Sequence, residues 1–218
     1  MKVTLVGASG MVGAPILDEL LNRGHEVTAV VRNPERIPDG KERLTVVSGD
    51  AFDAESVRGA VRGSDILITA VAMRDDAQRD DTARTPVDLI RTAAGVAEGA
   101  DIRFFAMGGA GSLEIAPGLQ LVDSPEFPAD YKAESGGFRD ALTWLRAEAP
   151  AGLNWTMISP PIEIDPASPR TGEYRTGADS LLADAAGASR ISAADLAVAV
   201  VDEVETPKHP RNRFTVAY

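Results

Sequence analysis

Short apolar runs alternate with longer amphipathic stretches along most of the chain. Short runs rich in branched and aromatic residues and bounded by turn residues predict buried β-strands. Apolar residues at three- and four-residue spacing predict helices between them. The predicted strands cover residues 2–6, 26–31, 44–47, 65–72, 102–107, 154–159 and 213–218, and the predicted helices cover the stretch up to residue 23, the stretch after Asp53, 86–98, 128–148 and 196–205. This alternation indicates an α/β fold with a doubly wound, mainly parallel sheet of about seven strands and helices on both faces.

One segment in the C-terminal third, residues 162–189, departs from this alternation. It is irregular, rich in Pro and Gly, and contains short strand-like pieces. Because it is inserted after the sixth predicted strand, we expect it to form a small lid-like region over the substrate. No internal repeat or linker divides the chain, so residues 1–218 are expected to form a single domain.

The first predicted strand runs directly into the glycine-rich sequence Gly-Ala-Ser-Gly-Met-Val-Gly, residues 7–13. A strand before such a loop, with a helix and a second strand after it, is the context of a Rossmann-type dinucleotide-binding site. Gly7 permits a tight turn, Gly10 lets the backbone approach a pyrophosphate, and Gly13 lets the helix pack closely on the sheet. The free N–H groups and the positive dipole end of that helix favour an anion. The alternative is a glycine-rich turn without a ligand.

The end of the second predicted strand bears on the choice of dinucleotide. Arg32 stands 19 residues after Gly13, where NAD-specific Rossmann enzymes usually carry Asp or Glu for the ribose 2′-hydroxyl. A carboxylate repels a 2′-phosphate, whereas a guanidinium binds it bidentately. Arg32 therefore favours NADP over NAD, and Ser9 adds a hydroxyl contact to the same phosphate. A solvated arginine at a strand end is the alternative.

Residues that follow the other strands are assigned to the cofactor because ligands bind at the carboxyl ends of such strands. Asp50 follows the third strand, where it either accepts the adenine amino group or serves as a turn or cap residue. Small residues after the fourth strand leave room for the cofactor, and the glycines after the fifth face the nicotinamide unless they form only a flexible turn. The full set is Gly7, Ser9, Gly10, Met11, Val12, Gly13, Arg32, Asp50, Ala51, Ala70, Val71, Ala72, Met107, Gly108, Gly109, Lys132 and Pro160.

Composition excludes several classes of function. The net charge of −11 argues against a nucleic acid or an anionic membrane as partner, because both require a basic face. The chain has no Cys, and its two histidines, His25 and His209, lie in separate segments, so no metal site is expected. A secretory signal pattern is lacking, and no apolar run approaches the roughly 18 residues that span a bilayer. We expect a soluble, cytoplasmic protein with a small-molecule partner; the oligomeric state, a homodimer included, stays open.

The chain resembles the atypical short-chain dehydrogenase/reductase superfamily, and most closely its NmrA-like, biliverdin-reductase-B-like and NADH-flavin-reductase-like branch. The resemblance covers nearly the whole chain and implies an NAD(P)-binding oxidoreductase. It is carried by Gly-Ala-Ser-Gly-Met-Val-Gly (7–13), Val-Val-Arg-Asn-Pro (30–34), Ser-Gly-Asp (48–50), Gly-Gly-Ala-Gly-Ser-Leu (108–113), Ser-Pro-Pro (159–161), Arg-Ile-Ser-Ala-Ala-Asp-Leu-Ala (190–197) and Arg-Phe-Thr-Val (213–216).

The chain departs from the superfamily at its usual catalytic pair. Carbonyl-reducing members use a Tyr as proton donor four residues before a Lys, which lowers the pKa of the Tyr and holds the ribose. Residue 135 is Ser and residue 178 is Ala, so neither Tyr131 nor Tyr174 has that partner. Ile162 stands where some relatives carry a His after the Pro-Pro pair. Lys132, as a ribose or charge-stabilising group, and Tyr131, as a donor, are the remaining catalytic candidates, with a solvated Lys as the alternative for Lys132.

The missing pair favours acceptors that need no fixed acid. Flavin N5 accepts hydride and can take its second proton from water, and quinones behave similarly, whereas a simple ketone needs an acid near its oxygen. We therefore expect an NADPH-dependent reductase of a flat conjugated acceptor such as a flavin or quinone. An NmrA-like sensor that binds NADP without turnover and an epimerase, dehydratase or biosynthetic reductase are the alternatives. The charged run over residues 74–81 is a solvated loop or a lid.

Overall fold

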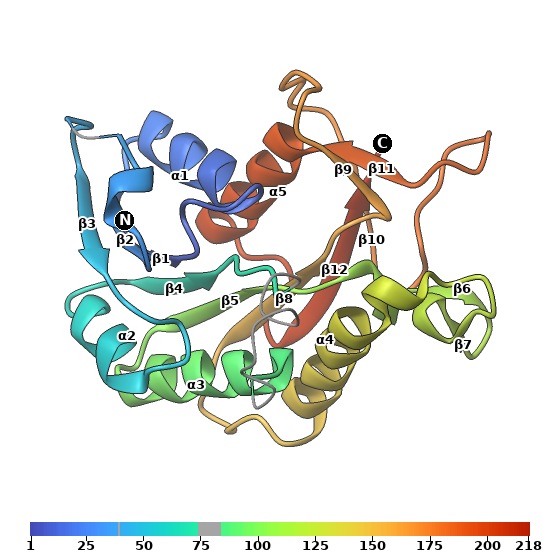
Figure 1. Ribbon diagram of the computed structural model, residues 1–218, viewed down its shortest axis with the longest axis horizontal. Coiled ribbons are helices and arrows are strands. Elements are labelled where there is room, and N and C mark those ends of the chain that lie inside the picture. Colours follow the sequence, from blue (N-terminus) through green and yellow to red (C-terminus); the bar gives the residue numbers. More distant parts are fainter. Residues whose placement is uncertain (39, 74–83) are drawn as a thin grey trace.

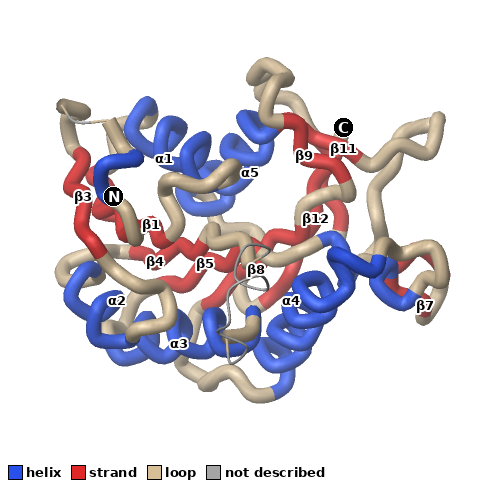
Figure 2. Tube along the Cα trace, viewed as in Figure 1, coloured by secondary structure: helices blue, strands red, loops and turns tan. Residues whose placement is uncertain are grey.

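The protein is a layered α/β structure built on one large sheet (Figure 1). The computed structural model describes residues 1–38, 40–73 and 84–218, so the charged run 74–81 lies outside the described residues. Figure 2 shows the strands lying between two layers of helices. The predicted Rossmann-type α/β fold with a mainly parallel sheet is therefore confirmed.

Within the described residues, the central sheet has eight strands, seven of them parallel. In spatial order they are β3 (Leu44–Ser48), β2 (Glu26–Val31), β1 (Lys2–Val6), β4 (Ile66–Thr69), β5 (Arg103–Met107), β8 (Trp155–Ser159), β12 (Asn212–Ala217) and β10 (Arg175–Gly177). The seven parallel strands are the seven predicted ones, and β10 adds an antiparallel edge beside β12. From β1, the chain first adds β2 and β3 on one side and then crosses to add β4 and β5 on the other. The carboxyl ends of β1 and β4 therefore form the topological switch point, where ligands bind in such sheets.

Helices cover both faces of the sheet (Figure 1). The helix α1 (Gly13–Asn22) packs with α5 (Ala193–Glu205) over one face, where Ile16 and Leu196 join the same buried cluster. On the other face lie α2 (Ala54–Ala60), α3 (Pro86–Gly99) and α4 (Ala129–Ala147), whose apolar side chains form a second cluster around Trp155. The inner strands β1, β4, β5 and β8 are buried on both sides, which explains their continuous apolar sequences.

Local capping explains where three of these helices begin. Asp53 Oδ1 accepts from the Glu55 N–H at 3.0 Å and caps α2. Thr85 and Asp88 form a reciprocal capping box at the start of α3, with Pro86 in its first turn. Ser192 Oγ accepts from the Asp195 N–H at 2.9 Å at the start of α5. These side chains satisfy N–H groups that a helix cannot satisfy itself.

Short elements complete the chain. The 3₁₀ turns and short strands are η1 (Pro34–Arg36), η2 (Ala110–Ser112), β6 (Glu114–Ala116), β7 (Leu119–Gln120), η3 (Leu121–Asp123), β9 (Glu163–Asp165) and β11 (Arg190–Ser192). The hairpin of β6 and β7 projects beside the amino-terminal end of α4 in Figure 1. None of the described helices is long and apolar enough to cross a membrane.

The irregular segment 162–189 is fastened at several points to the α1–α5 side. Its β9 pairs with β11, and its β10 joins the edge of the main sheet. Arg170 pairs with Glu19 of α1 at 2.9 Å. The Thr171 hydroxyl donates to Asp195 of α5 at 2.7 Å, and the Gly172 N–H donates to the same carboxylate at 2.7 Å. Its role as a substrate lid stays a prediction.

Candidate functional site

The loop between β1 and α1 folds back so tightly that it requires glycine. Gly7 has a φ of +89°, and a Cβ atom on it would lie 2.5 Å from the Ala70 carbonyl oxygen. A Cβ atom on Gly13 would lie 2.0 Å from the Gly7 carbonyl oxygen. The Gly10 N–H donates to that same oxygen at 3.0 Å. Two of the three motif glycines are thus explained by close backbone approach.

The amino-terminal end of α1 offers unpaired donors beside this loop. Its N-cap, Val12, makes no side-chain cap, and the first turn carries no acidic residue. Within the described residues, no hydrogen-bond acceptor is found for the backbone N–H groups of Met11, Val12 and Gly13. Such a helix end, with its positive dipole, suits a pyrophosphate. The residues present therefore fit the dinucleotide that the motif predicts.

Arg32 and Asp50 follow the neighbouring strands β2 and β3 at their carboxyl ends. Val31 pairs with Ser48, and the Gly49 N–H donates to the Val31 carbonyl at 3.0 Å, so the residues that follow lie side by side. The Arg32 side chain is exposed. This arrangement is the one that a 2′-phosphate contact to Arg32 requires, and that contact stays a prediction.

Asp50 has a structural role in its own loop. Its Oδ1 accepts from the Phe52 N–H at 3.0 Å, which is a turn role. Its Oδ2 lies 2.8 Å from Nη1 of Arg84. Its backbone N–H donates to Ser56 Oγ at 3.2 Å. The turn role is therefore present, the predicted contact with adenine is untested, and Ala51 lies half-buried in the same loop.

The exit from β4 forms the other wall of the switch point. Ala70 is buried and its N–H donates to the Val6 carbonyl at 2.9 Å, while Val71 is half-buried and Ala72 is exposed. The next residue, Met73, donates its N–H to Oε1 of Glu134 on α4 at 2.7 Å. The three small residues thus run along the crevice edge from β1 to α4.

The glycines after β5 are needed for packing. A Cβ atom on Gly108 would lie 2.9 Å from Met157 Sδ. A Cβ atom on Gly111 would lie 2.7 Å from Cβ of Ser135 on α4. Met107, Gly108 and Pro160 are buried at the ends of β5 and β8. The alternative of a flexible turn does not fit these contacts, and a nicotinamide contact stays a prediction.

One face of α4 meets this edge of the sheet. Glu134 contacts Met73, Ser135 lies against Gly111, and Phe138 lies against Gly109. Tyr131 precedes Glu134 by three residues and Ser135 by four, so it lies on the same helix face. Its side chain is 42% exposed. Lys132 is exposed and turned about 100° around the helix from Tyr131.

Three residues at this edge of the sheet carry no signal that we recognised in the sequence: Glu134, Phe52 and Arg84. Glu134 joins the β4 exit to α4, and Arg84 joins the start of α3 to the loop after β3. Spacing on α4 relative to Tyr131 could have indicated Glu134. Nothing in the local sequence indicates the Arg84 contacts.

A buried arginine, Arg213, supports the loop after β5 through hydrogen bonds. Arg213 on β12 is 2% exposed, and its Nη1 donates to Ser159 Oγ at 3.2 Å and Ser112 Oγ at 3.4 Å. Its Nε donates to Asp179 Oδ1 at 3.0 Å. Burial is the strongest influence on the pKa of Arg213 and holds it below its ordinary value, against the opposing effect of Asp179. The contacts are structural.

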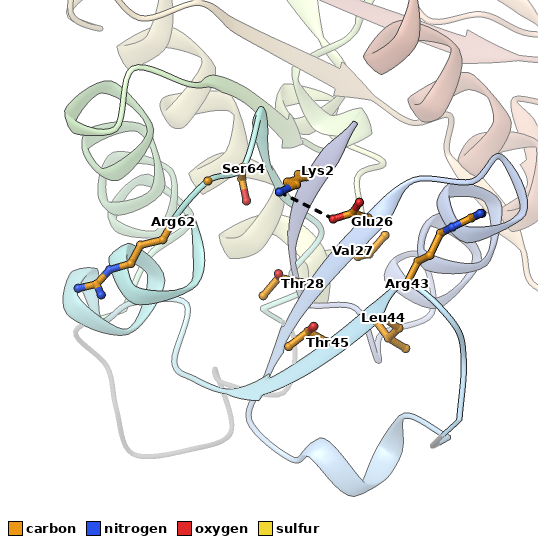
Figure 3. A pocket seen from close by; sticks show the side chains of 10 residues that line it. Lys2, Glu26, Val27, Thr28, Arg43, Leu44, Thr45, Arg62 and Ser64 are labelled. Atoms are coloured by element: carbon orange, nitrogen blue, oxygen red, sulfur yellow. Dashed lines mark ion pairs between the residues drawn. The ribbon is translucent and has the colours of Figure 1, made fainter.

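A hollow of about 380 Å³ lies at the opposite, amino-terminal edge of the sheet (Figure 3). Figure 3 shows Lys2 and Glu26 facing each other there, at a distance of 4.0 Å between Nζ and Oε2. Thr28, Thr45 and Arg62 also line it. This hollow is remote from the glycine loop and is not part of the crevice. Among the described residues, no group of three metal-ligating side chains is found.

The strand order and the glycine-rich loop at the switch point together define a Rossmann-type, dinucleotide-binding class of protein. A family described as NAD(P)H-binding matches residues 7–207. The chain therefore belongs to the NAD(P)H-binding family, as the resemblance to atypical short-chain dehydrogenases/reductases predicted.

Relatives match the chain along its whole length. The uncharacterized protein YwnB of Bacillus subtilis is 35% identical over 99% of this chain and 98% of its own. A Bacteroides thetaiotaomicron structure provisionally named an epimerase is 39% identical, covers 100% of this chain and 96% of its own, and has a TM-score of 0.89. A Streptococcus pneumoniae structure provisionally named an NADH-flavin reductase is 31% identical, covers 100% and 99%, and has a TM-score of 0.82. The fold is thus of an oxidoreductase-like kind.

Proposed function

We propose that the protein is an NADPH-dependent reductase that transfers hydride to a flat conjugated acceptor such as a flavin or a quinone. The observation that carries the proposal is the arrangement of α4 at the crevice. Tyr131 lies on the crevice face, yet the residue four positions later is Ser135, which packs on the glycine loop after β5. A packing residue, Ser135, thus stands where the usual Tyr–Lys pair would have its Lys. An acceptor that takes its proton from water suits a site without that pair.

Exposed apolar side chains support an aromatic acceptor. Met11 in the glycine loop is 50% exposed, and Ile162 after β8 is 57% exposed. Together with Tyr131 they follow or face the carboxyl ends of the strands, where a planar ring system would remove them from water. The relative provisionally named an NADH-flavin reductase favours the same class of acceptor.

The preference for NADPH is supported by Arg32. Arg32 is exposed and follows β2, whose neighbour β3 leads to the loop of Asp50, so its guanidinium would bind a 2′-phosphate at this edge of the sheet. The unpaired N–H groups at the start of α1 would hold the pyrophosphate, and Lys132 at the start of α4 would reach the ribose or the developing charge. When bound, the cofactor supplies the hydride, while the chain orients it and excludes water.

The test is NADPH oxidation, followed by the absorbance of the reduced nicotinamide, with and without FMN, riboflavin or a simple quinone. We expect acceptor-dependent oxidation well above the background of protein alone. A Lys2→Ala variant, at the opposite edge of the sheet, is the matched control and should keep the wild-type rate. Tight binding of NADP without turnover of FMN, riboflavin or the quinone would contradict the proposed reductase activity and favour an NADP-binding sensor.

A further inference from the structure

A charged and aromatic cluster lies after β3, at the edge of the sheet where the proposed function places the adenosine. It consists of Asp50 and Phe52 after β3 and Arg84 before α3, and we call it the adenosine-end cluster. The Arg84 guanidinium lies over the Phe52 ring, with Cζ 4.9 Å from the ring centre, and its Nη1 lies 2.8 Å from Asp50 Oδ2. One arginine thus contacts both the acid and the ring through different forces.

Both residues of the ion pair adjoin hydrogen-bonded local structure. Arg84 immediately precedes Thr85, which forms the capping box of α3 with Asp88. The loop of Asp50 is held by the hydrogen bond from its backbone N–H to Ser56 and by that from Phe52 to its carboxylate. The Asp50 and Arg84 side chains are each 34% exposed, so the pair is partly removed from water. Their geometry is therefore a property of the fold.

The Asp50 carboxylate keeps acceptor capacity after these contacts. An ionised carboxylate offers about four lone-pair positions. The Phe52 N–H takes one on Oδ1 and Arg84 takes one on Oδ2. Adenine carries an amino group that can donate to a remaining position. Hypoxanthine carries an oxygen in its place, which a carboxylate repels.

We propose that Arg84 is a positioning residue for adenine recognition, holding the Asp50 carboxylate where it accepts a hydrogen bond from the amino group of the cofactor's adenine. The inference rests on the cofactor site of the proposed function. Asp50 and Arg32 follow the paired strands β3 and β2, so the base and the 2′-phosphate would lie at the same edge of the sheet. Without Arg84 the carboxylate rotates more freely, and its selectivity for an amino group falls.

The experiment compares NADP with its hypoxanthine analogue by calorimetric titration. Wild-type protein should bind NADP about tenfold more tightly than the analogue, the ratio that one hydrogen bond of about 1.4 kcal/mol produces. Asp50→Asn should bring the ratio close to one. Arg84→Ala should lower it to about twofold, and Arg84→Lys, which keeps the charge but loses the planar group over the Phe52 ring, should restore only part of it.

Arg91→Ala is the matched control. Arg91 also lies on α3, over the Trp144 ring at 5.3 Å, and pairs with Glu148 at 3.8 Å, away from the adenosine-end cluster. It should leave the ratio at the wild-type value. Far-ultraviolet circular dichroism and the unfolding temperature check that each variant folds.

The outcomes separate this inference from the proposed function. An unchanged ratio in Arg84→Ala, or an equal loss of affinity for both dinucleotides, would overturn the positioning role. If wild-type protein binds neither dinucleotide, the cofactor site and the positioning role are both wrong. If the affinity ratios between NADP and its hypoxanthine analogue are as expected but no acceptor is reduced, the positioning role of Arg84 holds and only the proposed reductase activity is wrong.

Discussion

Glu134 on α4 accepts a hydrogen bond from the backbone N–H of Met73, with Oε1 2.7 Å from the nitrogen. Met73 is buried directly after the small residues at the exit of β4. The bond therefore joins the wall assigned to the cofactor to the helix that presents Tyr131. It is one of the contacts that hold the exit of β4 against α4.

Replacing Glu134 should let the exit of β4 and helix α4 move relative to each other. Glu134→Ala leaves the buried Met73 N–H without its acceptor, which costs roughly 1–3 kcal/mol. We expect the KM for NADPH to rise about five- to tenfold with a smaller change in kcat, and Glu134→Gln, which keeps an acceptor oxygen, to lie in between. Steady-state kinetics with a flavin acceptor measures both constants.

Glu148→Ala is the control for this change. Glu148 is exposed just after the far end of α4 and pairs only loosely with Arg91, at 3.8 Å. It should leave the KM for NADPH unchanged. Equal effects of Glu134→Ala and Glu148→Ala would show that the contact with Met73 does not position the cofactor wall.

Arg32→Asp should change the preference between the two dinucleotides. The carboxylate would repel a 2′-phosphate that the guanidinium binds, so affinity for NADP should fall by about 100-fold or more while affinity for NAD changes little. Titration with both dinucleotides checks this, with Arg36→Asp in η1 as the control. If both affinities move equally, Arg32 does not bind the phosphate.

Gly13→Ala should disrupt the glycine loop. The added Cβ atom would lie 2.0 Å from the Gly7 carbonyl oxygen, so the loop must open or α1 must move away from the sheet. We expect a loss of about 2–4 kcal/mol in the free energy of unfolding, measured in urea, together with loss of dinucleotide binding.

Gly95→Ala is the matched glycine substitution. Gly95 lies inside α3, and no atom lies within 4 Å of the place its Cβ would take. It should stabilise the protein by about 0.5–1 kcal/mol, because alanine is the better helix former. Similar losses in both variants would mean that backbone conformation in the loop is not what requires Gly13.

The sheet and its switch point could be predicted because their determinants are local. A parallel strand buried on both faces is a continuous apolar run, and the tight turn at Gly7 needs glycine whatever else the chain does. The same holds for the caps at Asp53 and Ser192, where each side chain acts within three residues. Local sequence patterns therefore predict the strands, the helices and the glycine-rich loop.

The edge strand and the contacts that position the candidate site depend on residues that lie far apart in the sequence. The strand β10, Arg175–Gly177, has no apolar pattern and exists through its pairing with β12. Glu134 and Met73 are 61 residues apart, and only the fold brings them together. Asp50 could be recognised as a polar residue after a strand, but its pairing with Arg84 could not. Positioning contacts of this kind leave no periodic signal in a sequence.

Asp195 should make stability depend on pH. Burial alone would raise its pKa, but hydrogen bonds from Tyr218, Thr171 and Gly172 outweigh burial and hold the pKa below its ordinary value. The stabilisation is complete above the unfolded pKa of about 3.9 and is lost as pH falls through the lower folded value. In Asp195→Asn, an amide would face these donors, so urea unfolding should show a loss of about 2–4 kcal/mol at pH 7 that shrinks below about pH 4. The exposed Glu173→Gln is the control, and a loss that stays constant with pH would contradict the assignment.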